Sequence, residues 1–343
     1  MWRNEEVLNF ITWLHDWNHK FERPEANSKH PVGFYGLDLY SLNTSIHAVI
    51  NYLDRIDANA AQRARQRYGC LYHFMDNPQD YGLALQSELA DSCEDEIVSQ
   101  LVELRRKARD YLERDGVDAK MQYFSAAQNA KIVKNAEHYY RSMFSGKINP
   151  WNIRDEHMFD TLKDLSNHLG ETRLKKAKVI VWAHNSHIGN AAATEMKQHG
   201  ETNIGQLVFE AHGREALRVG FSTSHGTVTA ASDWDEPAEY KNVNLPFPGS
   251  YEEVFHRVNH KNFLINLREN NSAVDLLMQP RLERAIGVIY RPMTERQSHY
   301  FQACLPEQFD FMIHIDNTTA VRPLETIPRF HKGEMDETYP FGI

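Results

Sequence analysis

The second half of the chain contains five short runs of apolar residues that alternate with helix-like segments. These runs lie at residues 178–184, 216–223, 262–268, 285–290 and 309–316. Continuous apolar runs of this length are typical of strands that are buried on both faces. Their alternation with helices predicts an α/β fold with a mainly parallel central sheet that helices flank on both sides.

The middle of the chain has the apolar period of helices almost throughout. Residues 83–112 and 119–144 are long periodic segments, and residues 151–170 form a third. The main break between them is "FSGKINPW", which contains both glycine and proline. Because these helices follow one another without strands between them, we expect a helical layer or subdomain here.

The N-terminal residues predict a helix at 5–19, a short strand at 32–39 and a second helix at 42–56. We therefore expect three parts in the chain. They are the N-terminal helix and strand of the α/β core at 1–40, the helical subdomain at 41–170, and the α/β core with its C-terminal tail at 171–343.

The 343 residues carry a net charge of −9 and include Cys70, Cys93 and Cys304. An acidic chain has no general attraction for nucleic acid or anionic lipid. No apolar run reaches the roughly 18 residues of a membrane span, and the acidic N-terminal segment is unlike a signal peptide. The odd number of cysteines argues against a disulfide framework or a structural zinc site and fits a reducing cytoplasm. We expect a cytoplasmic protein without nucleic-acid or membrane partners.

The first of the five apolar runs ends in "HNSH", which places His184 and His187 three positions apart. In an open parallel sheet, ligands bind at the carboxyl ends of the strands. Imidazole titrates near neutral pH, so either ring could accept a proton from water or bind a metal ion. Asn185 lies between them and could hold the rings in place. The alternative is that one histidine is a buried residue with satisfied hydrogen bonds and the other is a helix cap.

Asp38 has a similar placement, because it follows the expected strand at 32–39 and precedes a helix. Its carboxylate could orient a histidine, bind a substrate hydroxyl or cap the helix. Arg154, Asp155 and His157 lie in the first turns of the helix that follows the glycine–proline break. A guanidinium could hold a carboxylate or an oxyanion, whereas an aspartate near a helix N-terminus is favourable without any function.

Other polar residues follow later strands and could reach the same edge of the sheet, although each one alone has a structural explanation. They are His225, His299, His314 and Asp316. His225 has small neighbours and could line a pocket. The sequence contains no HExxH, no GxSxG and no glycine-rich phosphate loop, which argues against a zincin, a serine hydrolase and a nucleotide-dependent enzyme.

Four longer segments carry most of the sequence's likeness to known proteins. They are "VIVWAHNSHIGNAAATEM", "GFYGLDLYSL", "WNIRDEHM" and "PRLERAIGVIYRPMTERQSHYF". Together they resemble the erythromycin esterase family, and the resemblance extends from Trp2 to Phe341. It implies an α/β fold with a helical subdomain over a cleft. It also implies water attack on the ester of a macrolide lactone, with a histidine as general base and an arginine, carboxylates and further histidines around it.

The paired histidines of the family match His184 and His187, but the start of the sequence departs from the family's pattern. Family members carry, ahead of the text that matches residues 1–4, a portion with a motif like "GE-x-x-HGT-x-E". That portion supplies the first strands, acidic partners and the histidine usually assigned as the base. "SHGT" at 224–227 follows a different strand and lacks the acids, so this role is not transferred to His225.

We therefore expect a family member without its front portion, in which the reaction can be impaired. An internal start codon, a truncated gene or a neighbouring polypeptide would each explain this, and the undamaged strands and helices favour the first.

The expected function is hydrolysis of a small-molecule ester, a macrolide lactone or a similar compound, by water that a histidine activates. One alternative is a metal-assisted hydrolase with His184, His187 and a carboxylate as ligands. The other is a non-catalytic binding protein. No cofactor is expected apart from that divalent metal, and the sequence does not encode the oligomeric state. The candidate catalytic residues are His184, His187 and Arg154, and the candidate substrate-binding residues are Asp38, Asn185 and His225.

Overall fold

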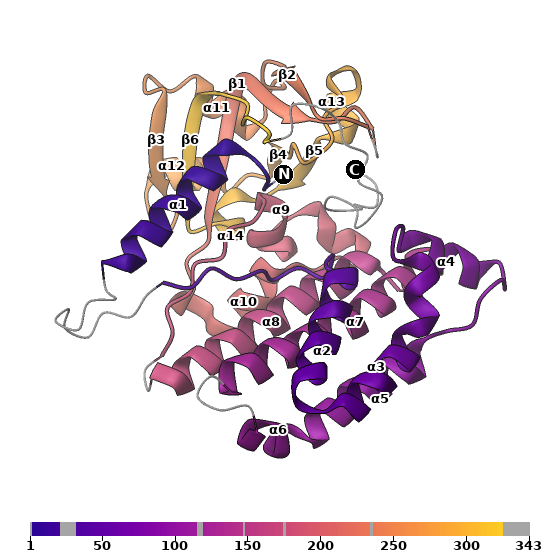
Figure 1. Ribbon diagram of the computed structural model, residues 1–343. Coiled ribbons are helices and arrows are strands. Elements are labelled where there is room, and N and C mark those ends of the chain that lie inside the picture. Colours follow the sequence, from indigo (N-terminus) through magenta and orange to yellow (C-terminus); the bar gives the residue numbers. More distant parts are fainter. Residues whose placement is uncertain are drawn as a thin grey trace.

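The computed structural model describes residues 2–20, 32–114, 119–146, 148–173, 176–233 and 236–324. The strands and several short helices form the upper part of Figure 1, and the longer helices lie side by side below them. The lower helices are α2 (Leu42–Ile56), α3 (Ala58–Tyr68), η1 (Gly69–Phe74), α4 (Gln79–Gln86), α5 (Glu94–Arg106), α6 (Ala108–Arg114), α7 (Ala119–Met143) and α8 (Pro150–Arg173).

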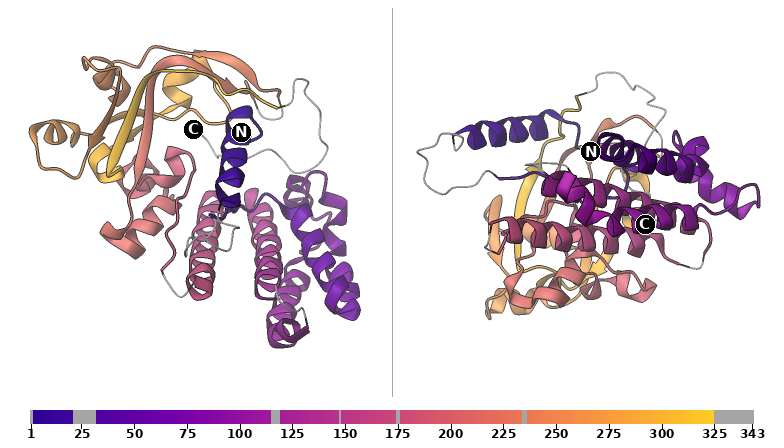
Figure 2. Two further views of the ribbon diagram at one scale, coloured as in Figure 1. Left: turned by 60° about the vertical axis from the view of Figure 1, so that its left-hand side comes forward. Right: turned by 60° about the horizontal axis from the view of Figure 1, so that its bottom comes forward.

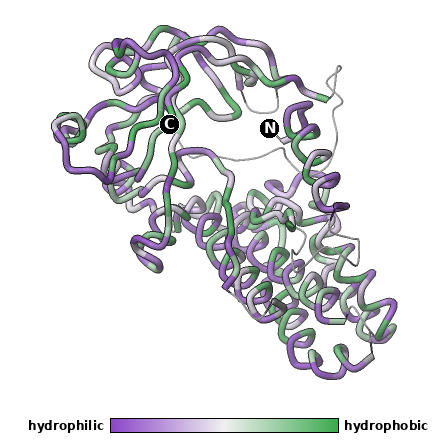
Figure 3. Tube along the Cα trace, turned by 90° about the vertical axis from the view of Figure 1, so that its left-hand side faces the viewer, coloured by the Kyte–Doolittle hydropathy of each residue, from purple (hydrophilic) through white to green (hydrophobic). Residues whose placement is uncertain are grey.

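The helical layer is arranged around α7, which contacts α2, α4, α5, α6 and α8. Apolar and polar residues alternate along these helices in Figure 3, and the buried residues of α2, α5 and α7 recur at helical spacing, so these three helices bury an apolar face. Large tyrosines lie fully buried between the helices, and Tyr81 is one of them. Its hydroxyl donates to Glu137 Oε1 at 2.8 Å and accepts from Cys93 N at 2.9 Å. The buried phenol therefore keeps its hydrogen bonds while its ring fills the core.

The periodic segment at 83–112 is three helices rather than one. The chain leaves α4 at Ser87, and Glu88 adopts a positive φ of 56° before α5 begins. Cys93 immediately precedes α5 and is joined to Cys70 of η1 by a disulfide. The expectation that the cysteines stay unpaired was wrong for these two, because their spacing matches no motif that reports a pairing. Cys304 is buried and free.

The upper part contains a four-stranded sheet and a two-stranded sheet. The orders are β2 (Glu239–Val243), β1 (Val219–Ala230), β6 (Phe311–Thr318), β3 (Asn262–Asn266) in the first and β4 (Arg281–Arg284), β5 (Tyr300–Ala303) in the second. Among the described strands, β1 and β6 are parallel and the other pairs are antiparallel.

The α/β fold with flanking helices is confirmed, but the sheet is mixed and the expectation of a mainly parallel sheet was wrong. Residues 231–238 join β1 to β2, which is too short a connection for the crossover that parallel neighbours need. The run at 285–290 is not a strand either. It makes a single bridge, from Ile289 to Ala231, and the ladder forms at the preceding residues of β4.

Short helices surround the sheets and complete a second core. They are α9 (Asn185–Ile188), η2 (Ala191–Ala193), η3 (Glu195–His199), α10 (Ile204–His212), η4 (Gly213–Glu215), α11 (Tyr251–His256), α12 (Ser272–Leu277), η5 (Pro292–Thr294), α13 (Glu295–Ser298) and α14 (Leu305–Gln308). Tyr251, Phe255, Phe309 and Met312 form the centre of this core. It is separate from the core of the helical layer. No helix in the described part of the chain is both long and apolar enough for a membrane span.

The two expected strands nearest the N-terminal helix are extended but unpaired. Residues 32–39 form no ladder, and neither do residues 178–184. The exposed fraction of Ile180 is 96%, so the prediction of a buried strand at 178–184 was wrong. An apolar run is buried only where neighbouring strands and a covering layer exist.

The N-terminal helix α1 (Glu5–His19) begins and ends where the sequence predicted. It packs beside the extended residues 178–184. Trp182 contacts Trp2 and Phe10 edge to face, with ring centroids 5.1 and 5.6 Å apart. The indole of Trp182 therefore has aromatic neighbours, although 56% of the residue remains exposed.

Candidate active site

The four residues of "HNSH" form the start of α9, between the sheet and the helical layer (Figure 1). His184 is the N-cap of this short helix, and its Nδ1 accepts a hydrogen bond from Ser186 N at 3.2 Å. Its Nε2 therefore carries the proton and donates to Ile286 O at 3.1 Å. Burial and the nearby His187 lower the pKa of His184 to about 4. His184 is therefore the helix cap that the structural alternative expected for one of the two histidines.

His187 is buried in a different environment. Its Nδ1 donates to Asp155 Oδ1 and Oδ2, at 3.1 and 3.0 Å, and its ring stacks on Trp151 with centroids 4.4 Å apart. Nε2 has no hydrogen-bond partner among the described residues. A carboxylate on one ring nitrogen fixes the tautomer and leaves a lone pair on the other, which is the arrangement of a general base.

Asp155 connects three elements at this point. It lies in the first turns of α8, and its Oδ1 also accepts a hydrogen bond from Ile204 N at the start of α10. The carboxylate has no exposed surface. Its two partners, Ile204 N and His187 Nδ1, satisfy it without water, so the position of the imidazole is fixed by three helices.

Arg154 precedes Asp155 and binds the carboxylate of Asp38. Its Nε lies 3.0 Å from Asp38 Oδ1, and its Nη2 lies 2.6 Å from Oδ2. Burial raises the pKa of Asp38, but the charge of Arg154 outweighs it and the pKa is lowered overall. Tyr40 lies under the guanidinium, 4.7 Å from ring centroid to Cζ.

One donor of this guanidinium remains unused. Arg154 Nη1 is buried and has no partner among the described residues. Only 5% of the side chain is exposed, and its pKa is raised, so it stays charged. A buried donor of this kind can bind a carboxylate, or stabilise charge that develops on an oxygen.

The comparisons with known proteins agree with the resemblance that the sequence carries. A sequence profile described as erythromycin esterase matches residues 1–318. The chain belongs to the erythromycin esterase family. A mutant of the erythromycin esterase EreC in its open conformation has a TM-score of 0.61 and 13% identity, over 94% of this chain and 74% of that one.

Two other solved structures share the fold of this family member. A succinoglycan biosynthesis protein has a TM-score of 0.69 and 20% identity, over 94% of this chain and 72% of that one. A Bacillus cereus protein has a TM-score of 0.70 and 19% identity, over 94% and 74%. Membership of the family makes the chain a hydrolase of the erythromycin esterase type.

In this erythromycin esterase family member, the side-chain amide of Asn185 is hydrogen-bonded to the backbone of β1. Its Nδ2 donates to Phe221 O at 2.7 Å, and its Oδ1 accepts from Phe221 N at 3.1 Å. The side chain thus pairs with the edge of β1 as a strand residue would. These contacts position α9 beside the sheet and leave the amide few groups for a substrate.

Several of the other sequence candidates lie apart from His187. His157 is buried between Asn135, with 2.7 Å from its Nδ1 to Asn135 Nδ2, and the backbone of Asp38. His299 accepts from Arg291 N at its Nε2. His225, His314 and Asp316 belong to a separate cluster within β1 and β6. The structure therefore brings Asp38, Arg154, Asp155 and His187 together. His157 adjoins Asp38, His184 and Asn185 belong to the same short segment as His187, and the remaining candidates lie elsewhere.

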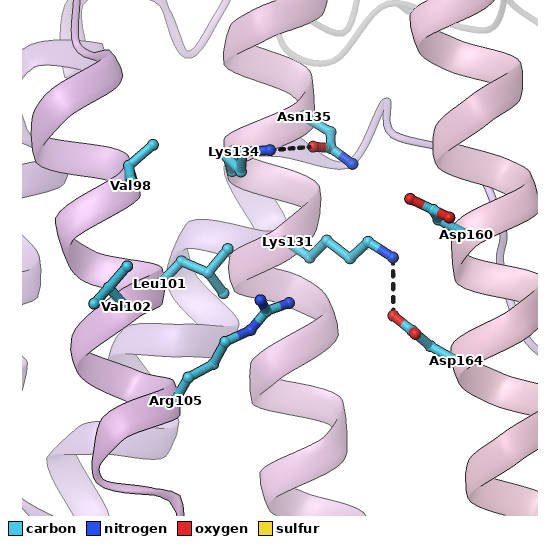
Figure 4. A pocket seen from close by; sticks show the side chains of 9 residues that line it. All are labelled: Val98, Leu101, Val102, Arg105, Lys131, Lys134, Asn135, Asp160 and Asp164. Carbon is cyan, nitrogen blue, oxygen red and sulfur yellow. Dashed lines mark hydrogen bonds and ion pairs between the residues drawn. The ribbon is translucent and has the colours of Figure 1, made fainter.

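Two pockets in the described part of the chain lie away from His187. The larger, of 420 Å³, is a groove among α5, α7 and α8, where Lys131 pairs with Asp164 at 2.8 Å (Figure 4). The other, of 310 Å³, lies beside Tyr290 and Lys241. Neither lining includes His187 or Arg154, so these pockets do not define a substrate site around them.

Gly205 sets the approach of α10 to α9 and gives a direct test of this scaffold. A Cβ at this position would overlap the backbone oxygens of Ile188 and Gly189. We expect Gly205→Ala to lower the free energy of unfolding by about 1–3 kcal/mol, because the clashing atoms belong to the backbone rather than to a flexible side chain. Urea unfolding followed by circular dichroism measures this. Gly69→Ala is the control, because open space surrounds its Cβ, and equal losses in both variants would contradict the prediction.

Sequence reasoning missed a pair of buried carboxyl groups next to Asn185. Glu283 is 2% exposed and Glu252 is 1% exposed. Glu283 Oε1 lies 3.4 Å from Asn185 Nδ2, and Arg284 N donates to Glu252 Oε1 at 3.0 Å. Burial and the neighbouring Glu252 raise the pKa of Glu283 to about 8. Their segments look like ordinary amphipathic stretches, and no local pattern marks this pair.

The raised pKa makes stability depend on pH. An unfolded glutamate titrates near 4.5, so the folded state binds more protons than the unfolded state between about pH 4.5 and 8. The free energy of unfolding therefore falls as the pH rises through this window. We expect Glu283→Gln to remove this loss and to gain stability relative to the wild type towards pH 8. Urea midpoints across the window test this, with the exposed Glu171→Gln as control, and a pH-independent difference would contradict it.

Proposed function

We propose that this family member cleaves a carboxylic ester and that His187 is the general base that activates water. The observation that carries the proposal is the Asp155–His187 pair, in which one ring nitrogen is held by a buried carboxylate and the other is unoccupied. General-base catalysis of this kind contributes about 10²–10⁴-fold to a rate. His184 supports the site as the cap of the helix that carries His187.

In the proposed step, water gives a proton to His187 Nε2 while its oxygen bonds to the carbonyl carbon of the ester. The carbonyl π electrons move to the oxygen and give a tetrahedral oxyanion. When the oxyanion collapses, the bond to the alcohol oxygen breaks, and the imidazolium returns the proton to the leaving alkoxide. Asp155 stays ionised throughout and stabilises the imidazolium.

Arg154 is proposed to stabilise the oxyanion through Nη1. The donor is buried, charged and without a partner in the described residues, so it needs no reorganisation when charge develops. Asp38 binds the Nε and Nη2 edge of the guanidinium, so Nη1 points away from this carboxylate. The proposed substrate-binding role of Asp38 is therefore indirect.

The proposed substrate is a small-molecule ester, either a macrolide lactone or a compound with a similar ester bond. The proposed location is the cytoplasm. Disulfides are rare in that compartment, so thiol trapping of Cys70 and Cys93 in intact cells is a direct check of the location.

The experiment is to incubate the purified chain with erythromycin and with a series of simple aryl and alkyl esters in water enriched in ¹⁸O. Hydrolysis adds the elements of water, and one ¹⁸O appears in the product carboxylate by mass spectrometry. We expect turnover of at least one ester at a rate that a metal chelator does not change at 25 °C.

The outcome that excludes ester hydrolysis is a folded protein that turns over none of these esters. Loss of turnover on chelation, with recovery on adding metal back, would instead favour the metal-assisted mechanism. In that mechanism His184 would have to release Ser186 and Ile286 before it could bind a metal.

A further inference from the structure

A second group of titratable side chains lies within β1 and β6, beside α11. His225 comes from β1, His256 is the last residue of α11, and Asp316 comes from β6. One potential ligand atom from each of the three lies within 4.8 Å of the others. Figure 1 shows α11 beside these two strands. The cluster shares no contact with the residues around His187 in the described part of the chain.

The carboxylate of this cluster is ionised and firmly held. Its Oδ1 lies 2.6 Å from His256 Nδ1 and 3.4 Å from His314 Nε2, and Ser222 Oγ contacts the other nitrogen of His314 at 2.8 Å. Burial opposes ionisation, but the hydrogen bonds from His256, Lys261 and His314 outweigh it and lower the pKa of Asp316 to about 2. Such supporting contacts around a carboxylate are what orient metal ligands.

Each histidine can present a nitrogen lone pair to an ion that the carboxylate binds, and His256 does so once Nδ1 releases the proton that it now donates to Asp316. His225 Nδ1 lies 3.2 Å from Ser224 Oγ, and donation there leaves Nε2 free to act as a ligand. The rings of His225 and His256 lie edge to face, with centroids 5.6 Å apart. Both histidines are half-buried, so each ring can turn by the small amount that contraction around an ion requires.

We propose that His225, His256 and Asp316 bind a divalent transition-metal ion, with Zn²⁺ as the best match. Two imidazoles and one carboxylate form a ligand set typical of zinc, and they leave a fourth position for water. The ion would sit between His256 Nδ1 and Asp316 Oδ1 and replace the hydrogen bond that now joins them. Because its ligands come from β1, α11 and β6, bound metal would fasten the helix to the sheet.

Lys261 competes with the ion for the same carboxylate. Its Nζ lies 3.1 Å from Asp316 Oδ2, but 67% of its side chain is exposed. A long, exposed lysine can swing into water when an ion binds. Removing the charge of Lys261 should therefore strengthen metal binding.

The test is titration of the full chain with Zn²⁺ by calorimetry, and with Co²⁺ by visible absorption, which reports the coordination directly. The background variant carries His19→Gln, because His15 and His19 form an exposed pair on α1, 2.9 Å apart, that can bind metal independently. We expect one ion per chain. His256→Gln and Asp316→Asn should each weaken binding at least about 10-fold, and Lys261→Met should tighten it. His260→Gln, at an exposed neighbouring histidine, should change nothing.

Three results would overturn the proposal. They are the absence of a one-to-one binding event, affinities that His256→Gln and Asp316→Asn leave unchanged, and an unchanged affinity in Lys261→Met. Circular dichroism of each variant shows whether it is folded. Lys261→Met keeps the test decisive if a ligand variant fails to fold, because it alters an exposed side chain and predicts a gain.

Discussion

Replacing His187 by alanine is expected to lower kcat for ester hydrolysis by about 10²–10⁴-fold, the contribution of a general base. KM should change much less, because the imidazole acts on water rather than on the bound ester. Asp155→Asn should also lower kcat, since an amide no longer fixes the Nδ1–H tautomer of His187 or stabilises the imidazolium. Steady-state kinetics on the best ester of the series measure both.

The matched control for these variants is His212→Ala, which removes an exposed histidine from the end of α10. Circular dichroism and urea unfolding show whether each variant keeps its fold. If folded His187→Ala retains the kcat of the wild type, His187 is not the base. If Asp155→Asn raises KM and leaves kcat unchanged, Asp155 shapes the binding site rather than the base.

Replacing Arg154 by methionine is expected to lower the free energy of unfolding by about 3 kcal/mol. This is the lower end of the range for breaking a buried ion pair, because a third of the Asp38 side chain is exposed. The loss arises mainly because Asp38 is left charged beside a space that held its partner. Urea unfolding measures it, and the exposed pair of Arg65 and Asp54 is the comparison, where Arg65→Met should cost at most about 1 kcal/mol.

The pH dependence of this loss has a definite sign. In the folded wild type the pKa of Asp38 is lowered from 3.8, so the stabilisation is present above about pH 4 and is lost as the pH falls further. The gap between wild type and Arg154→Met should therefore shrink in acid. Adding Asp38→Asn to the variant should recover part of the loss, and strictly additive effects of the two substitutions would show that the pair is not coupled.

The parts of the fold that the sequence predicted are those that local chemistry determines. The periods of α1, α2 and α8 were clear, and Asn4 caps α1 by accepting a hydrogen bond from a backbone N–H. Strands β1 and β6 were also identified from apolar runs. The direction of strand pairing, the disulfide and the exposure of 178–184 depend on contacts between distant segments, which no local pattern reports.

The candidate site divides in the same way. His187 could be selected from its position after an apolar run, but its partner Asp155 is distant in sequence and had a sufficient explanation as a helix-terminal acid. Arg154 and Asp38 were each identified, whereas their ion pair was not. His184 and His187 have different neighbours, because three-residue spacing on so short a helix turns the two rings apart. The catalytic role expected for His184 stays a prediction.

The carboxylate shared by His187 and Ile204 has a consequence for how the protein responds to heat. Asp155 belongs to the helical layer. His187, whose imidazole it binds, lies on α9 in the half of the protein that contains the strands. Warming that loosens only the contacts between the two halves would separate His187 from Asp155 while each half stays folded. Activity should then be lost at a lower temperature than the fold. The contacts between the two halves, rather than either core, would set the highest temperature at which the protein is active.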